Sequence, residues 1–245
     1  MIKINKTSLD LDIKNEYDYE IGDFFPIIDI YPLNKTDQEI IDKFHKLYFK
    51  LLEKRSGLEI SWLGYSTGKM TTDLWTYQEI ITKQKPELII ECGTYKGGST
   101  LFLASMCMMI GVGKVITIDK YPKPNRPKHK LIEYVNGGST DTEILEYVKS
   151  KASSVKNILV ILDSDHSKSH VHSEILAYKD LVPVGGYLIV EDTFLNGHPS
   201  HSDFGPGPME AVDKFLKNND DFIIDRSCEH FLATLNPRGY LKKVK

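Results

Sequence analysis

The sequence has few cysteines, no long apolar run and no excess of positive charge, and each absence excludes a class of protein. Its 245 residues contain three cysteines at wide spacing, which fits neither a disulfide framework nor a zinc cluster. Lysine and arginine number 31 against 34 acidic residues, a net charge of −3, so no basic field attracts nucleic acid. No run approaches the ~20 apolar residues that cross a bilayer, and the N-terminus lacks the apolar segment of a signal peptide. We therefore expect a cytoplasmic protein that binds neither nucleic acid nor a membrane.

The sequence does contain the ordinary mixture of a globular protein, with 41% hydrophobic and 27% charged residues. In residues 36–52 apolar side chains recur at spacings of three and four, which predicts an amphipathic helix. Residues 72–85 show the same pattern before Pro86, whereas two prolines break any periodicity in residues 1–35. We therefore expect an N-terminal arm and helix over residues 1–57, followed by the main domain over residues 58–245.

After Pro86 short apolar runs alternate with helical stretches, which is the pattern of parallel β-α-β units. The run 158–162 is apolar at every position, as expected of a strand covered by helices on both faces. We predict an α/β fold with a doubly wound, mostly parallel sheet, and we interpret residues 242–245 as a solvated tail. The expected strands are 88–91, 115–119, 131–135, 158–163, 187–191, 222–225 and 231–235, and the expected helices are 99–110, 141–151, 169–181 and 208–217.

The first strand of this sheet runs into a glycine-rich loop, Glu91-Cys-Gly-Thr-Tyr-Lys-Gly-Gly-Ser99, which leads straight into a helix. In open α/β sheets the ligand site lies beyond the carboxyl ends of the strands, where glycine allows a ligand to approach the backbone. Asp119 ends the next strand 21 residues beyond Gly98, about where such folds place the carboxylate that binds ribose hydroxyls. Loop and acid together predict a nucleoside-containing cofactor. The spacing of Gly93 and Gly97 differs from the dinucleotide fingerprint, which argues against NAD.

The segment Glu91-x-Gly93-x-Tyr95-x-Gly97-x-Ser99 resembles the first motif of the catechol and caffeoyl-CoA type of S-adenosylmethionine-dependent O-methyltransferase. The resemblance implies that this loop, including Thr94, wraps the methionine part of the cofactor and that Asp119 holds the ribose. It also implies that Ser139, in the turn 137–141, lies near the adenine, and that Asp163 borders the cofactor. Capping of the following helix is an equally good interpretation of Ser139 and Asp141.

Three acids at the ends of two later strands form a second constellation: Asp163, Glu191 and Asp192. Because the carboxyl ends of parallel strands meet at one edge of a sheet, we expect these side chains to lie close together, beside the cofactor. Carboxylates clustered without lysine or arginine in the same motifs repel one another unless a cation neutralises them. Hard oxygen ligands of this kind suit Mg²⁺. Helix capping would explain one such acid, but for all three together we predict a magnesium site.

The stretch Glu191-Asp-Thr-Phe-Leu-Asn-Gly197 resembles one in metal-dependent plant O-methyltransferases, with Glu-Asp where those enzymes have Asp-Asn. This pair is the pattern of the cephalosporin hydroxylase family and of related macrolide-sugar and rhamnosyl O-methyltransferases. Three other stretches look like that family, which the chain resembles over about residues 60–240: Asp73-Leu-Trp-Thr-Tyr-Gln-Glu79, Ile161-Leu-Asp-Ser-Asp-His166 and Phe204-Gly-Pro-Gly-Pro208. The resemblance implies a seven-stranded, Rossmann-like class I methyltransferase fold.

The same resemblance implies an activity. The expected reaction transfers the methyl group of S-adenosylmethionine to a hydroxyl, held on Mg²⁺, of a small-molecule acceptor, which by resemblance is a sugar. We also expect a homo-oligomer. Two alternatives stay open: a tailoring protein like cephalosporin hydroxylase, and a non-catalytic module that binds S-adenosylmethionine. The intact acids count against the second, and the sequence shows no two-histidine-one-carboxylate iron motif for a redox enzyme.

His166 follows Asp163 by three residues and is the candidate catalytic base. Sugar O-methyltransferases of this group resemble the sequence in having histidine there, and a free imidazole, with a pKa of about 6.5, can take a proton from an acidified hydroxyl. The alternative is a histidine that orients a carboxylate. We interpret the spacing of His166, His170 and His172 as a poor zinc motif. The loops 62–69 and 197–208 are expected either to cover cofactor and acceptor or to be plain surface connections.

Overall fold

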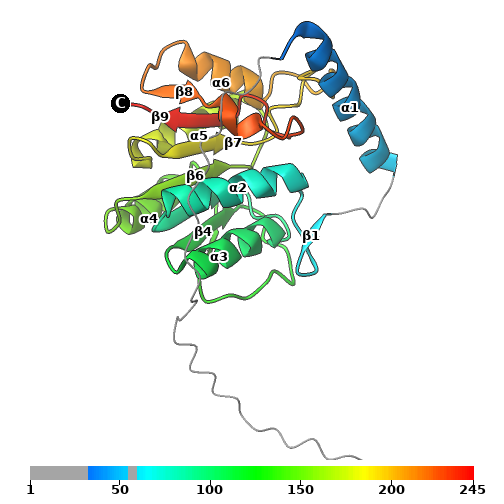
Figure 1. Ribbon diagram of the computed structural model, residues 1–245. Coiled ribbons are helices and arrows are strands. Elements are labelled where there is room, and N and C mark those ends of the chain that lie inside the picture. Colours follow the sequence, from blue (N-terminus) through cyan, green and yellow to red (C-terminus); the bar gives the residue numbers. More distant parts are fainter. Residues whose placement is uncertain (1–32, 55–59) are drawn as a thin grey trace, which may run out of the picture.

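The computed structural model describes residues 33–54 and 60–245, so most of the predicted N-terminal arm lies outside the described residues. A seven-stranded sheet forms the centre, with helices on both faces (Figure 1). Its strands are β3 (Leu88–Cys92), β4 (Lys114–Asp119), β5 (Ile132–Asn136), β6 (Ile158–Leu162), β7 (Tyr187–Val190), β8 (Phe222–Ile224) and β9 (Tyr240–Lys243). The helices are α1 (Lys35–Lys54), α2 (Thr71–Gln84), α3 (Gly98–Ile110), α4 (Thr142–Ala152), α5 (Lys168–Tyr178) and α6 (Pro208–Leu216). None of the helices in these described ranges is both long and apolar enough to traverse a membrane.

The strand order is β5-β4-β3-β6-β7-β9-β8. The five strands from β5 to β7 run parallel, and β9 is antiparallel to both β7 and β8. The chain leaves β3 for β4 on one side and returns to β6 on the other, so the switch point at which α/β sheets bind ligands lies between β3 and β6. The predicted doubly wound, mostly parallel fold is confirmed.

Two apolar clusters cover the two faces of the sheet, because alternate residues of each strand point to opposite sides. Ile89 of β3 packs in one cluster with α2 and α3, and Ile90 packs in the other with α4, α5 and α6. Both strand residues are fully buried. These helices fix the positions of the strand ends, and therefore of the loops that carry the candidate site.

The last strand lies at 240–243, so the prediction of a strand at 231–235 was wrong. The predicted solvated tail was wrong for Lys242 and Lys243, which belong to this strand, whereas Val244 and Lys245 are exposed. Tyr240 and Leu241 of β9 are fully buried in the sheet. Leu235 lies instead in an irregular segment, where its backbone N–H donates to Asp73 Oδ2 at 2.9 Å and its side chain joins a third apolar cluster. Tertiary packing thus overrides the strand-like apolar pattern of this segment.

The segment 62–69, expected to be a loop, contains a two-stranded hairpin, β1 (Ser61–Trp62) and β2 (Tyr65–Ser66). Trp62 fixes the hairpin to α3: its indole N–H donates to Ser105 Oγ at 3.1 Å. The hairpin backbone comes so close to the start of α3 that a Cβ at Gly98 would lie 2.1 Å from the carbonyl oxygen of Ser66. The residues after the hairpin are thereby directed toward the ends of β6 and β7.

Candidate active site

The sheet register brings the predicted residues to one edge. Cys92, the last residue of β3, is paired with Ile118 of β4 and Leu162 of β6. The next residue of each of these segments is Gly93, Asp119 and Asp163, so the glycine loop and two of the predicted acids lie level with one another. Gly93 has φ +98, and a Cβ there would lie 1.8 Å from the Asp163 carbonyl oxygen. Only glycine permits this approach, which closes the floor of the crevice between β3 and β6.

A cavity of about 440 Å³ opens above this floor, within the range typical of small-molecule sites. Five of the nine residues predicted to bind the cofactor line it: Gly93, Tyr95, Asp119, Ser139 and Asp163. The other four, Glu91, Thr94, Gly97 and Ser99, are not among its lining residues. Residues that the sequence motifs did not identify also line it, His170 and Lys123 among them.

Glu91 lies behind the cavity wall and is 1% exposed. Its carboxylate accepts three hydroxyl hydrogen bonds, from Ser99 at 2.6 Å, Thr100 at 2.5 Å and Thr117 at 2.6 Å. Burial raises the pKa of Glu91, against the opposing effect of these three donors. In this structure Glu91 therefore ties the start of α3 to β3 and β4, while its predicted contact with the cofactor stays a prediction.

Asp119 is held in the cavity by donors from the surrounding loops. Its carboxylate accepts the backbone N–H of Tyr95 at 3.0 Å and that of Tyr121 at 2.7 Å. Arg126 pairs with it at 2.5 Å and also donates to the Tyr95 carbonyl oxygen at 2.9 Å. Arg126 was not singled out from the sequence, because only the fold brings residue 126 to the end of β4.

Ser139 belongs to a polar cluster in the wall of the cavity. Its hydroxyl lies 2.5 Å from Glu174 Oε1, which also accepts from Ser164 Oγ at 2.6 Å. The His170 imidazole lies 3.2 Å and 3.1 Å from the two serine oxygens. Asp141 is the N-cap residue of α4 and accepts the Gly138 N–H at 2.8 Å. His170 is therefore engaged in the cavity wall, and in the described part of the chain it is not in a group suited to a metal.

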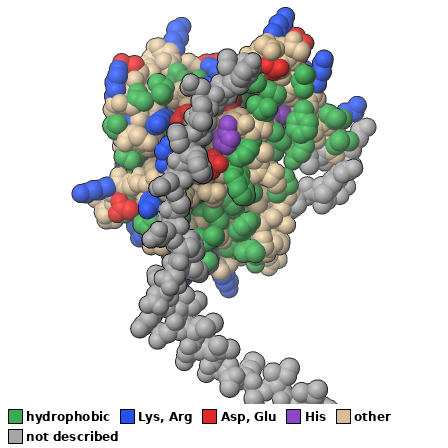
Figure 2. Space-filling view, in the orientation of Figure 1, with side chains coloured by type: hydrophobic (Ala, Val, Ile, Leu, Met, Phe, Trp, Pro, Cys, Tyr) green, Lys and Arg blue, Asp and Glu red, His purple; other side chains and the backbone are tan. Residues whose placement is uncertain are grey.

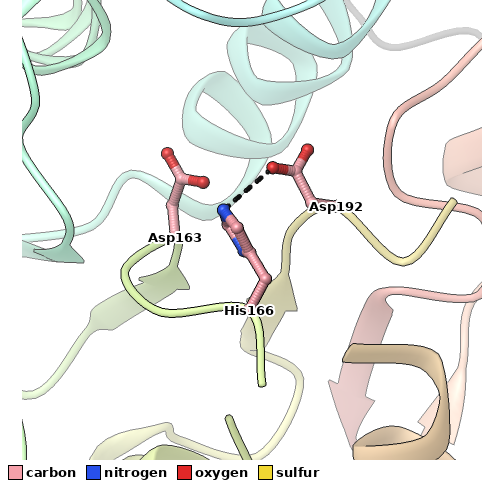
Figure 3. A group of neighbouring side chains, drawn as sticks. All are labelled: Asp163, His166 and Asp192. Atoms are coloured by element: carbon pink, nitrogen blue, oxygen red, sulfur yellow. Dashed lines mark ion pairs between the residues drawn. The ribbon is translucent and has the colours of Figure 1, made fainter. Parts of the chain in front are cut away.

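The group that could hold a metal in the described residues is Asp163, His166 and Asp192. One ligand atom from each side chain lies within 4.8 Å of those of the other two. Figure 3 shows the three side chains converging from the loops that follow β6 and β7, with an ion pair between His166 and Asp192. Nε2 of His166 lies 3.2 Å from Oδ2 of Asp192. All three side chains are partly exposed, so an ion and an acceptor could reach them.

Glu191 is placed differently from the other two predicted metal ligands. Its side chain is fully buried, and Oε2 lies 2.6 Å from Nζ of Lys69. Lys69 also pairs with Oδ2 of Asp163. The acids have no lysine or arginine in their own motifs, but the segment after the hairpin brings one to them from elsewhere in the sequence. The signal in the sequence was a lone lysine between Gly68 and Met70, in a stretch otherwise free of charge.

The donor set nevertheless fits a divalent cation. Burial raises the pKa of Asp192, and Asp163 adds to this effect while His166 opposes it. Oε1 of Glu191 is buried without a hydrogen-bond partner. Such repulsion and incomplete pairing are relieved when a cation enters among carboxylates. Carboxylate oxygens with partial access to water are the donors that Mg²⁺ prefers.

The loop after Asp192 packs against α1. The Phe194 ring stacks on Phe49 of α1 with centroids 4.2 Å apart, and His201 meets both rings edge-on. A second cavity, of about 610 Å³, lies between α1, this loop and the segment before β9. Its lining includes Ile41, His45, His198 and Thr234. Gly197, His198 and Pro199, at the start of the loop 197–208, therefore contribute to the wall of this cavity.

The sheet order, the cofactor-sized cavity at its switch point and the acids at its strand ends define a class I methyltransferase fold. Two solved structures of CmcI share this fold. An apo-structure of CmcI aligns with a TM-score of 0.60 at 21% identity, covering 76% of each chain. A CmcI structure described with Mg and SAM aligns with a TM-score of 0.58 at 20% identity, covering 76% of this chain and 77% of that one.

The family follows from sequence comparison. The family model for "Rhamnosyl O-methyltransferase/CmcI" matches residues 55–244. The rhamnosyl O-methyltransferase of Mycobacterium tuberculosis is 35% identical over 214 residues, covering 84% of this chain and 86% of that protein. The corresponding protein of Mycobacterium leprae is 37% identical over 185 residues, covering 74% and 80%. The chain belongs to the rhamnosyl O-methyltransferase/CmcI family, and the resemblance inferred from its motifs is confirmed.

Proposed function

We propose that this protein transfers the methyl group of S-adenosylmethionine to a hydroxyl of a sugar-containing acceptor, with Mg²⁺ as the metal. The observation that carries the proposal is that Asp163 belongs to two sites at once. This residue lines the cavity of about 440 Å³ and also belongs to the group with His166 and Asp192. A methyl donor in the cavity and an acceptor at the acids would thus lie on either side of one carboxylate. Relatives named for methylation of rhamnosyl groups support a sugar as the acceptor.

The cofactor would occupy the cavity at the end of β3. Asp119 is the candidate partner of the ribose, since its carboxylate faces the cavity and is oriented by two backbone N–H groups. Ser139 also lines the cavity and belongs to the polar cluster with Glu174. This arrangement supports the ribose at Asp119 and the adenine near Ser139, with Gly93 and Tyr95 beside the methionine part.

The metal would be held by Asp163 and Asp192, with Glu191 immediately behind them. A divalent ion bound there would lower the pKa of an acceptor hydroxyl. His166 would take the hydroxyl proton at its imidazole, and Asp192, 3.2 Å away, would stabilise the resulting positive charge. The acceptor oxygen would form a bond to the methyl carbon while the bond between that carbon and the sulfonium sulfur breaks. The other product would be S-adenosylhomocysteine.

Two wider features belong to the same proposal. The three cysteines are all buried and free, which supports a reducing compartment such as the cytoplasm. Figure 2 shows hydrophobic side chains gathered over α1, where four residues in one stripe are 44–60% exposed: Ile40, Phe44, Leu47 and Leu51. This stripe supports the predicted homo-oligomer, and the division into residues 1–57 and 58–245 likewise stays a proposal.

The test is binding followed by product analysis. Calorimetric titration with S-adenosylhomocysteine should give micromolar affinity, roughly −7 to −8 kcal/mol. Incubation with S-adenosylmethionine, Mg²⁺ and a panel of rhamnosides should then give a product one methyl group heavier by mass spectrometry. A protein that binds NADH and not S-adenosylhomocysteine would contradict the proposal.

A further inference from the structure

Lys69 is the one buried lysine among the described residues, and its backbone is held in place by neighbouring contacts. The residue as a whole is 4% exposed, and Met70 after it is equally buried. Its N–H donates to Thr67 Oγ1 at 3.3 Å, and Thr67 is bonded in turn to the Ile60 carbonyl oxygen at 2.9 Å. Lysine is almost never buried without a partner. The short path from hairpin to α2 therefore delivers one ammonium group to a defined place.

That place is the buried side of the three acids Asp163, Glu191 and Asp192, here called the inner side. Nζ of Lys69 lies 2.6 Å from Oε2 of Glu191 and pairs with Oδ2 of Asp163. Burial alone would lower the pKa of Lys69, but the attraction of Asp163, Glu191 and Asp192 outweighs it, and the pKa lies above its usual range. With two carboxylates in contact, the Lys69 side chain is placed as the ammonium partner of this acid group.

The contacts divide the acids into two sides that share Asp163. On the inner side are Lys69 and Glu191, whose side chains are 3% and 0% exposed. On the outer side are His166 and Asp192, at 27% and 22% exposure. Asp163, at 19% exposure, pairs with Lys69 and also belongs to the outer group. A divalent ion on the outer side would thus draw on a carboxylate that Lys69 already holds.

We propose that Lys69 is a resident cation of the metal site, which holds Asp163 and Glu191 together before the metal binds and competes with the metal for them. This inference rests on the proposed metal dependence. Lys69 is a positioning residue: it touches the ligands, and its effect falls on metal affinity and on the stability of the metal-free protein.

The experiment compares Lys69→Met, which removes the charge and keeps much of the side-chain volume, with Lys69→Arg, which keeps the charge. Lys83→Met, at an exposed position in α2, is the matched control. Mg²⁺ and Mn²⁺ affinities of the full chain are measured by calorimetry without cofactor or acceptor, and melting temperatures are measured with and without Mg²⁺. Because a unit charge beside the ion is lost, Lys69→Met should bind either metal at least about tenfold more tightly than wild type.

Without metal, Lys69→Met should melt below wild type, and saturating Mg²⁺ should restore most of the difference. Lys69→Arg and Lys83→Met should bind metal with nearly wild-type affinity. Equal or weaker metal binding by Lys69→Met, with normal binding by wild type, would overturn the role of Lys69 alone. A Lys69→Met protein that stays unfolded in saturating Mg²⁺ would overturn it too, since the ion should replace the missing charge. Absence of metal binding by wild type would instead overturn the proposed metal dependence.

Discussion

Nε2 of His166 lies 3.2 Å from Oδ2 of Asp192, although the two residues follow different strands, β6 and β7. The contact gives the imidazole a negatively charged neighbour on the side where a metal is expected. An imidazole so placed can accept a proton and share the resulting charge with the carboxylate. The candidate base, His166, and a candidate metal ligand, Asp192, are thus in direct contact.

The His166→Ala variant should lower kcat by about 10²–10⁴-fold, the usual contribution of a positioned base. Its affinity for S-adenosylhomocysteine should be unchanged, because His166 is not among the cavity-lining residues. His172→Ala, on the adjoining helix α5, is the control. A His166→Ala variant with normal kcat would exclude His166 as the base.

Asp119→Asn tests the cofactor site. The substitution keeps the shape of the side chain but removes its charge, and hydrogen bonds to charged groups contribute about 1.5–3 kcal/mol. Calorimetry should therefore show S-adenosylhomocysteine binding weakened by roughly tenfold to a hundredfold. Asp220→Asn, which alters an exposed acid paired with Lys245, should bind normally. Equal affinities in the two variants would show that Asp119 does not hold the ribose.

Much of this site could be predicted because it depends on strand ends. Gly93, Asp119 and Asp163 follow strands whose apolar runs are evident in the sequence, and parallel register brings such residues level. Glu191 shows where that reasoning stops. Asp192 follows the end of β7 and has a φ of +55, outside the extended region, so the alternation of a strand does not fix where its side chain points relative to Glu191. Here Glu191 faces inward and Asp192 faces the open side.

Other features depended on contacts between distant segments, which the sequence pattern does not specify. Lys69 reaches the acids because the hairpin packs on α3, and nothing in the pattern around residue 69 specifies that packing. Phe49 lies in a helix that the sequence predicts, but its stacking on Phe194 could not be predicted from the sequence. The apolar run 231–235 has the composition of a strand, but its backbone is bonded to Asp73 instead of a neighbouring strand.

Phe49→Ala tests the contact between α1 and the loop after Asp192. Phe49 is 6% exposed and stacks on Phe194, whereas Phe44 of the same helix is 49% exposed. Removing a buried phenylalanine ring typically costs about 3 kcal/mol or more of the free energy of unfolding. Phe44→Ala should change it by no more than about 0.5 kcal/mol. Urea denaturation measures both, and equal effects would refute the packing of α1 on this loop.

Glu210 predicts how stability depends on pH. Its carboxylate accepts the Gly207 N–H at 2.7 Å and the Asn196 amide at 2.8 Å, and lies 2.9 Å from His198. Burial would raise its pKa, but these donors outweigh burial and lower it to about 2. Because the unfolded pKa is higher, at 4.5, the stabilisation is fully present above that pH and is lost as pH falls toward about 2.

In Glu210→Gln this contribution should be missing. Urea denaturation should find the variant less stable than wild type at neutral pH, with a difference that shrinks as the pH falls below about 4.5. A difference that is constant across this range would contradict the assignment. A difference that grows in acid would mean that the carboxylate binds its proton more tightly in the folded protein.

In the proposed reaction, methyl transfer takes place beside a divalent ion held by Asp163 and Asp192. The most direct measurement follows the labelled methyl group of S-adenosylmethionine into a rhamnose-containing acceptor, before and after treatment with EDTA. Transfer should be lost in EDTA and restored by Mg²⁺, and Asp192→Asn should impair it while S-adenosylhomocysteine still binds. Full transfer in EDTA, or by Asp192→Asn without added metal, would contradict the account.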